Sequence, residues 1–210
     1  MDISSEKKNL RKKIRRLIES MPEKKRTEES DECCQKIIES SDFKNADAVL
    51  CYMATENEIN TDMICTRAIR EKKILALPKT IPGTNLMDFH VIDEKINLEK
   101  QISTGMWGIR EPLPSLTRFT TEKILERKKS GGKILALIPG VAFTKEGTRL
   151  GHGKGFYDIY LEKLIESCEK ENIGLTLTGI CFSTQIFEIL PKDFHDVIMD
   201  NVVFSSREPD

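Results

Sequence analysis

One stretch of this chain, residues 136–158, limits what it can fold into more than any other. An apolar run ends at Pro139-Gly140, a glycine-rich basic loop follows, and a helical pattern begins directly after the loop. A strand that leads through glycines into a helix start presents backbone N–H groups and the positive helix end to an anion. The stretch therefore predicts binding of a nucleotide or another phosphorylated ligand. The glycines and cations of the loop are Gly147, Gly151, Gly153, Gly155, Lys145, Arg149 and Lys154.

The loop matches neither of the common phosphate-binding fingerprints. The Walker pattern requires glycine at position 148 and a hydroxyl residue at 155, where this chain has Thr148 and Gly155. The dinucleotide pattern requires glycine at 156, which is Phe156. The alternative interpretation is a flexible surface turn with solvated charges.

The length of 210 residues predicts a single domain over residues 1–210, and we expect a cytoplasmic monomer. Charged residues make up 32% of the chain, but the net charge is only −1, so nucleic acid is not indicated as a partner. No apolar run is long enough to cross a membrane, and residues 1–18 lack the apolar core of a secretory signal. The six cysteines have no C-x-x-C spacing, which favours buried free thiols over disulfides or a zinc site.

Short apolar runs alternate with helical patterns, which predicts an α/β fold with a mostly parallel sheet covered on both faces. Two amphipathic helices come first and should pack on the body, the second capped by Ser20 with Pro22 in its first turn. The inner stripe of the first helix should hold Leu10, Ile14, Leu17 and Ile18. The glycine loop and residues 53–58 lie beyond strand ends, where such folds bind ligands. The expected helices are 4–20, 22–40, 61–72 and 158–170; the expected strands are 48–53, 74–77 (ended by Pro78), 86–93 (exposed), 134–138, 175–182 and 201–204.

Motifs along nearly the whole chain resemble the 5-formyltetrahydrofolate cyclo-ligase (methenyltetrahydrofolate synthetase) family. The long loop is the most specific of them, because Pro-Gly, Arg-Leu-Gly and Gly-Phe-Tyr-Asp occur together at family spacing. The matching segments are 7–11, 58–61, 73–78, 105–112, 138–158, Gln185 and His195-Asp196. The resemblance implies a three-layer α/β/α sandwich and an enzyme that uses ATP and Mg²⁺. In the implied reaction, ATP phosphorylates the formyl oxygen of 5-formyltetrahydrofolate to an imino-phosphate. N10 then attacks that carbon, and phosphate leaves as the ring of 5,10-methenyltetrahydrofolate closes.

The resemblance also implies which residues hold the nucleotide. Lys154 and Arg149 would act on the transferring phosphoryl group, where catalysis is positioning and charge neutralisation. Lys7 and Arg11 are four residues apart and could hold phosphate from one helix face, although an ordinary solvated basic face is the alternative. The full implied set is Lys7, Arg11, Arg149, Leu150, Gly151, His152, Gly153, Lys154, Gly155, Phe156 and Tyr157.

For the folate and the metal, the resemblance implies two further sets. Glu58 could accept hydrogen bonds from the pterin, and Trp107 could stack on the ligand, with solvated loop and core packing as the respective alternatives. Asp158 and Asp196 would bind Mg²⁺, as hard carboxylate oxygens do, although Asp158 could instead favour the helix dipole and Asp196 could be a solvated turn residue. The implied folate set is Met53, Glu58, Trp107, His152, Gly153, Lys154, Gly155 and Phe156.

Two positions depart from the family pattern: Thr144 replaces a usual aspartate, and Phe156 replaces a common tyrosine. Neither change touches the cations or Asp158. Two competing functions remain. One is a sugar-phosphate isomerase or transferase on a related scaffold, and the other is a non-catalytic folate- or nucleotide-binding module.

Overall fold

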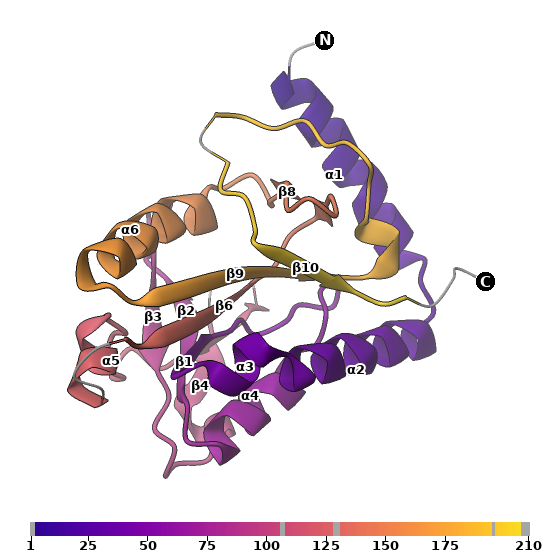
Figure 1. Ribbon diagram of the computed structural model, residues 1–210. Helices are drawn as coiled ribbons and strands as arrows, with labels where there is room; N and C mark the ends of the chain where they lie inside the picture. Colours follow the sequence, from indigo (N-terminus) through magenta and orange to yellow (C-terminus); the bar gives the residue numbers. More distant parts are fainter. Residues whose placement is uncertain (1–2, 106–107, 128–130, 195, 207–210) are drawn as a thin grey trace.

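A computed structural model describes residues 3–105, 108–127, 131–194 and 196–206 (Figure 1). None of the described helices is long and apolar enough to cross a membrane. The helices are α1 (Ile3–Glu19), α2 (Glu23–Glu39), α3 (Ser41–Asn45), α4 (Asp62–Arg70), α5 (Glu122–Arg127), α6 (Phe156–Glu171) and the 3-10 turns η1 (Leu98–Gln101) and η3 (Ser183–Gln185). The strands are β1 (Ala48–Leu50), β2 (Ile74–Thr80), β3 (Met87–Val91), β4 (Ile102–Thr104), β5 (Arg110–Pro112), β6 (Lys133–Ile138), β7 (Ala142–Phe143), β8 (Arg149–Leu150), β9 (Gly174–Cys181) and β10 (Asn201–Phe204).

A six-stranded sheet in the order β10-β9-β6-β1-β2-β3 forms the centre of the molecule (Figure 1). All neighbouring pairs are parallel except β2 and β3, which form an antiparallel pair. In the middle of the sheet, Leu50 of β1 lies opposite Ala76 of β2 and Ala136 of β6. The predicted mostly parallel sheet is confirmed.

Alternate residues of each central strand enter two separate cores, because successive strand side chains point to opposite faces. Val49 and Leu135 pack with residues of α1 to α4, whereas Leu50 and Ala136 pack with residues of α5 and α6. Helices therefore cover both faces, and the N-terminal helices pack on the body through Ile14 and its neighbours. The three-layer α/β/α sandwich is confirmed.

Two strand predictions need correction. β2 does not end at Pro78 but continues to Thr80, because its register with β1 stops at Ala76 and its last residues pair with β3. A proline, which has no backbone N–H, is tolerated in a strand where no neighbouring strand on that side needs a hydrogen bond from it. β3 is an edge strand but is not exposed, since Met87 and Phe89 are buried in the core shared with α6.

Two predictions for the N-terminal helices were also wrong. Ser20 does not cap α2: the N-cap residue is Pro22, and the Ser20 hydroxyl donates to the Leu17 carbonyl at the end of α1. Leu17 is 40% exposed, so the buried stripe of α1 is narrower than expected.

All six cysteines are free and buried, as predicted.

Candidate active site

A short β-hairpin that sequence patterns did not reveal organises the glycine-rich loop. β7 and β8 pair antiparallel and bring Phe143 opposite Arg149. Thr144 closes the turn: its N–H donates to the Thr148 carbonyl, and its hydroxyl accepts from the Thr148 N–H. A strand of two residues is too short to show the alternation of apolar and polar residues, so the sequence could not predict this hairpin. Threonine at position 144 therefore supports the hairpin, and Arg149 is held on a defined strand.

Arg149 is a buried cation with one unused donor. Its Nη2 lies 2.5 Å from Asp158 Oδ1 in the first turn of α6, and its Nη1 donates to the Pro139 carbonyl at 3.3 Å. The guanidinium also lies 5.7 Å from the centre of the Tyr157 ring. Its Nε is buried and has no hydrogen-bond partner among the described residues. A buried donor without a partner costs free energy, so this edge of Arg149 suits an acceptor from a ligand.

Two glycines allow the loop to pass close to the cations. A Cβ atom at Gly151 would lie 2.9 Å from Arg149 Nη1, so a side chain there would collide with the guanidinium. Gly155 precedes α6 with φ of +74°, a left-handed conformation that favours glycine. The first N–H groups of α6 are left without a side-chain cap. The positive end of a sixteen-residue helix thus faces the loop.

Helix α1 contributes the predicted pair of cations, Lys7 and Arg11. Arg11 Nε donates to the Gly151 carbonyl at 2.7 Å. Lys7 Nζ lies 2.7 Å from both Asp193 Oδ2 and Asp196 Oδ2, and Figure 1 shows the segment before β10 running alongside α1. Burial lowers the pKa of the Lys7 ammonium, but the hydrogen bonds to Asp193 and Asp196 outweigh burial and raise it. No sequence motif had indicated that Asp193 would contact Lys7.

Glu58 lies next to His152 of the glycine loop. His152 Nε2 is 3.3 Å from Glu58 Oε1, and Glu58 Oε2 accepts from the Thr55 N–H and hydroxyl, each at 2.9 Å. Burial raises the pKa of Glu58, but the hydrogen bonds from His152 and Thr55 outweigh burial and lower it. The carboxylate is therefore charged near neutral pH. Met53 is buried nearby, two residues before Thr55.

The two carboxylates proposed for the metal are each paired with a cation. Asp158 contacts Arg149, and Asp196 contacts Lys7 and accepts from the Asp193 N–H at 2.7 Å. Within the described ranges, no three His, Cys, Asp or Glu side chains converge into a set that could hold a metal. This donor set suits an ion bound mainly by phosphates and water with one or two carboxylates, which is how Mg²⁺ binds.

The remaining predicted residues differ in how far the structure describes them. Lys154 is exposed and has no hydrogen bond or ion pair with the described part of the chain. Leu150 is buried on β8, and Phe156 and Tyr157 are half-buried at the start of α6. Burial and the nearby charge of Glu58 raise the pKa of the Tyr157 hydroxyl well above its usual value, so it stays protonated. Trp107 lies outside the described residues.

The chain matches a family model, 5-formyltetrahydrofolate cyclo-ligase family, over residues 3–205. The chain belongs to the 5-formyltetrahydrofolate cyclo-ligase family. It is 30% identical over 98% of its length to a probable 5-formyltetrahydrofolate cyclo-ligase of Caenorhabditis elegans, covering 95% of that protein. It is 28% identical over 96% of its length to the 5-formyltetrahydrofolate cyclo-ligase of Mus musculus, again covering 95% of the relative.

Solved structures agree with this assignment. An NMR structure of Aquifex aeolicus 5,10-methenyltetrahydrofolate synthetase is similar with a TM-score of 0.69 and 26% identity, over 94% of this chain and 88% of that chain. A 5,10-methenyltetrahydrofolate synthetase from Mycoplasma pneumoniae shares the fold, with a TM-score of 0.68 and 22% identity, over 94% of this chain and 98% of that chain. Membership makes this protein an enzyme of the cyclo-ligase family, whose members use ATP.

Gln185 stabilises the start of the glycine-rich stretch through hydrogen bonds to its backbone. This residue belongs to the cyclo-ligase motifs, but the sequence indicated no role for it. Its side chain is buried, and its Nε2 donates to the Gly140 and Val141 carbonyls, each at 2.9 Å. Its Oε1 accepts from the Phe182 N–H at 2.8 Å. Arg149 satisfies the adjacent Pro139 carbonyl, so two side chains fix three successive carbonyls at the end of β6.

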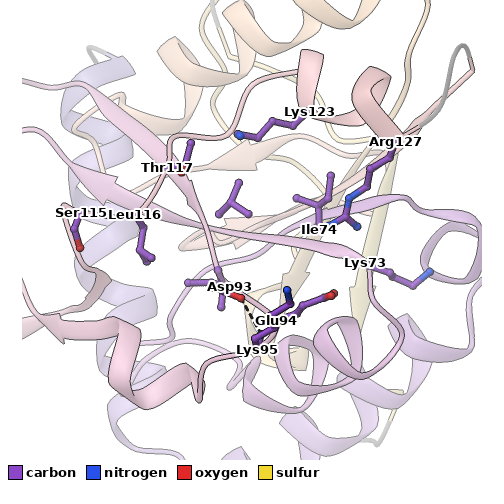
Figure 2. A pocket seen from close by; sticks show the side chains of 12 residues that line it. Lys73, Ile74, Asp93, Glu94, Lys95, Ser115, Leu116, Thr117, Lys123 and Arg127 are labelled. Carbon is purple, nitrogen blue, oxygen red and sulfur yellow. Dashed lines mark hydrogen bonds between the residues drawn. The ribbon is translucent and has the colours of Figure 1, made fainter.

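A separate pocket of about 390 Å³ lies where β2 begins, at the sheet edge opposite the strand ends that lead to the loop (Figure 2). Figure 2 shows Lys73 and Arg127 at this pocket. Both cations are already used: Lys73 Nζ donates to the Lys44 and Ala46 carbonyls, and Arg127 Nη1 donates to the Lys72 carbonyl. None of the residues predicted to bind ATP or folate lines this pocket.

Proposed function

We propose that this protein cyclises 5-formyltetrahydrofolate to 5,10-methenyltetrahydrofolate with ATP and Mg²⁺, releasing ADP and phosphate. The observation that carries the proposal is the buried Arg149 guanidinium, which has an unused Nε donor beside a glycine loop at a helix start. The reaction is inferred from family membership, and we propose that this cluster of donors binds the phosphates of ATP. The six free thiols support a reducing compartment, and we propose the cytosol and a monomeric enzyme.

The cations neutralise and position the phosphates. Bound ATP supplies a phosphoryl group, which converts the formyl oxygen into a leaving group. Arg149 is held in place by Asp158 and the Pro139 carbonyl, so its positive charge is already positioned before the phosphates bind, which is the condition under which a charge stabilises a transition state most. Lys154 is free to move onto the transferring group, and the N–H groups from Gly151 to Gly155 are donors along the loop. Lys7 and Arg11 hold the nucleotide from α1.

Glu58 orients the folate. A charged carboxylate that is largely buried seeks donors, and the pterin offers amino and ring N–H groups. His152 and Thr55 fix the carboxylate before the ligand arrives. Met53 and Phe156 provide apolar contact nearby, and the protonated Tyr157 can donate a hydrogen bond. The substrate stays oriented while N10 attacks the formyl carbon, the carbon–oxygen bond breaks, and phosphate and the N10 proton leave.

Asp158 and Asp196 would hold Mg²⁺ together with the phosphates. Each carboxylate already touches a cation assigned to phosphate binding: Asp158 contacts Arg149, and Asp196 contacts Lys7. The decisive experiment follows the near-ultraviolet absorbance of methenyltetrahydrofolate with purified protein, ATP, Mg²⁺ and 5-formyltetrahydrofolate. The expected result is a rise that requires all components and matches ADP release from labelled ATP. Conversion of a sugar phosphate, or ligand binding without turnover, would replace this proposal with one of the competing functions.

A further inference from the structure

Helix α2 carries two adjacent buried polar residues, Glu29 and Ser30, that the proposed reaction does not use. The carboxyl oxygens of Glu29 accept from the N–H and the hydroxyl of Ser183, at 2.7 and 2.8 Å. The Ser30 hydroxyl accepts from the Asn60 N–H at 3.2 Å. Burying a carboxyl group is costly even when it is hydrogen-bonded, so apolar packing alone does not account for Glu29. The two contacts reach different segments of the active site.

The contact of Glu29 leads to the glycine-rich loop. Ser183 is the first residue of η3, and Gln185 is its last. Gln185 in turn donates to the Gly140 and Val141 carbonyls, which lie between β6 and the β7–β8 hairpin. One short turn therefore has Glu29 at one end and the backbone of the loop at the other.

The contact of Ser30 leads to the segment that carries Glu58. Asn60 lies two residues after Glu58, in a motif whose other residues had no assigned role. One helical turn beyond Ser30, Cys34 Sγ donates to the Asn60 carbonyl at 3.0 Å. Both backbone polar groups of Asn60 are thus held by α2, which fixes the chain next to the predicted folate ligand.

We propose that Glu29 and Ser30 are positioning residues for the two substrates. Glu29 acts on the nucleotide loop through Ser183, and Ser30 acts on the Glu58 segment through Asn60. This inference rests on the proposed function. Because the two residues are adjacent on one helix, α2 supports both substrate sites and sets each of them through its own hydrogen bonds.

The test compares the KM values for ATP and for 5-formyltetrahydrofolate in the whole enzyme. Ser30→Ala removes the acceptor of the Asn60 N–H and should raise the folate KM about fivefold, the effect of one hydrogen bond, with the ATP KM unchanged. Glu29→Ala removes both acceptors of Ser183 and should raise the ATP KM about tenfold, with the folate KM unchanged. Glu29→Gln should restore most of the ATP KM, because the amide can accept from the Ser183 N–H and donate to its hydroxyl.

Two substitutions at exposed positions of α2 serve as controls and should change neither KM. Thr27→Ala removes a hydroxyl that donates only to the Glu23 carbonyl of the same helix, and Asp31→Asn removes an exposed carboxylate. If Glu29→Ala does not fold, Ser183→Ala removes the hydroxyl donor alone and should raise the ATP KM about threefold.

The split between the two KM values is a result that loss of stability alone would not give. Parallel increases of both KM values in Ser30→Ala and Glu29→Ala would show a general disturbance of the fold and overturn the proposal. Unchanged KM values in Ser30→Ala and Ser183→Ala would also overturn it, while leaving the proposed function standing. Absence of turnover in the unmodified enzyme would instead refute the proposed function.

Discussion

Arg149 and Asp158 form a 2.5 Å ion pair that joins strand β8 to the first turn of α6 across the glycine loop. The pair holds the buried guanidinium of Arg149 against the start of α6. It also means that a residue proposed for phosphate and a residue proposed for metal already touch each other. Perturbing either one should therefore affect both ligands.

Lys154→Ala should lower kcat by about 10²-fold, or ~3 kcal/mol in the barrier, with little change in the folate KM. The exposed ammonium has no structural partner among the described residues, so its loss should not affect folding. Steady-state kinetics check this. Lys145→Ala is the control, because Lys145 belongs to the same loop but lies 6.0 Å from the Phe204 ring. Equal kcat values in Lys154→Ala and the unmodified enzyme would make Lys154 an ordinary solvated residue.

Glu58→Gln should raise the folate KM about tenfold and leave the ATP KM nearly unchanged. The amide replaces an acceptor oxygen with a donor that faces the donors of the pterin, a mismatch of about 1–3 kcal/mol. Glu56→Gln, in the same loop but exposed, is the matched control. Parallel increases in both KM values would point to a disturbed fold rather than to folate recognition.

Asp158→Asn should raise the Mg²⁺ concentration needed for half-maximal activity steeply, and Asp196→Asn should raise it more mildly. Asp158 contributes a carboxylate at the helix start, whereas Asp196 is partly committed to the Asp193 N–H. Activity is titrated against Mg²⁺ at fixed ATP for both variants. An unchanged requirement in Asp158→Asn would leave that residue as the partner of Arg149 alone.

The same Asp158→Asn protein should also be less stable without any ligand. It leaves the buried Arg149 guanidinium without its counter-charge, and loss of one partner of a partly buried pair costs about 1–3 kcal/mol. Denaturant unfolding of ligand-free protein measures this. Asp196→Asn, which leaves Lys7 paired with Asp193, should lose less stability.

Glu32 provides a pH test outside the active site. Hydrogen bonds from Lys36, from the Ser206 N–H and from the Ser205 hydroxyl lower the pKa of Glu32 to about 2. Because the native pKa lies below the unfolded one, the stabilisation is complete above about pH 4.5 and is lost as the pH falls toward about 2. Glu32→Gln should therefore be destabilised near neutral pH, and the difference from the unmodified protein should shrink across that window. A constant difference down to pH 2 would refute the assignment.

The sequence by itself determined the layered α/β fold, because apolar runs such as 134–138 can be buried only between helices on both faces. It also indicated an anion site, since glycines and cations between a strand and a helix are local features. The resemblance rested on the same local motifs, and the family comparison supports it.

Only the tertiary structure decided which charges meet. Lys7 contacts Asp193 and Asp196, almost the length of the chain away, and Glu58 meets His152 from another strand end. Such pairings depend on the order of strands in the sheet, which leaves no periodic trace in the sequence. The same holds for Pro78, whose place in a strand depends on where the neighbour β1 ends, and for Gln185, whose three hydrogen bonds to the backbone exist only once β6 and the segment after β9 lie side by side. Local patterns specify elements and their faces, whereas packing alone selects the partners of each polar group.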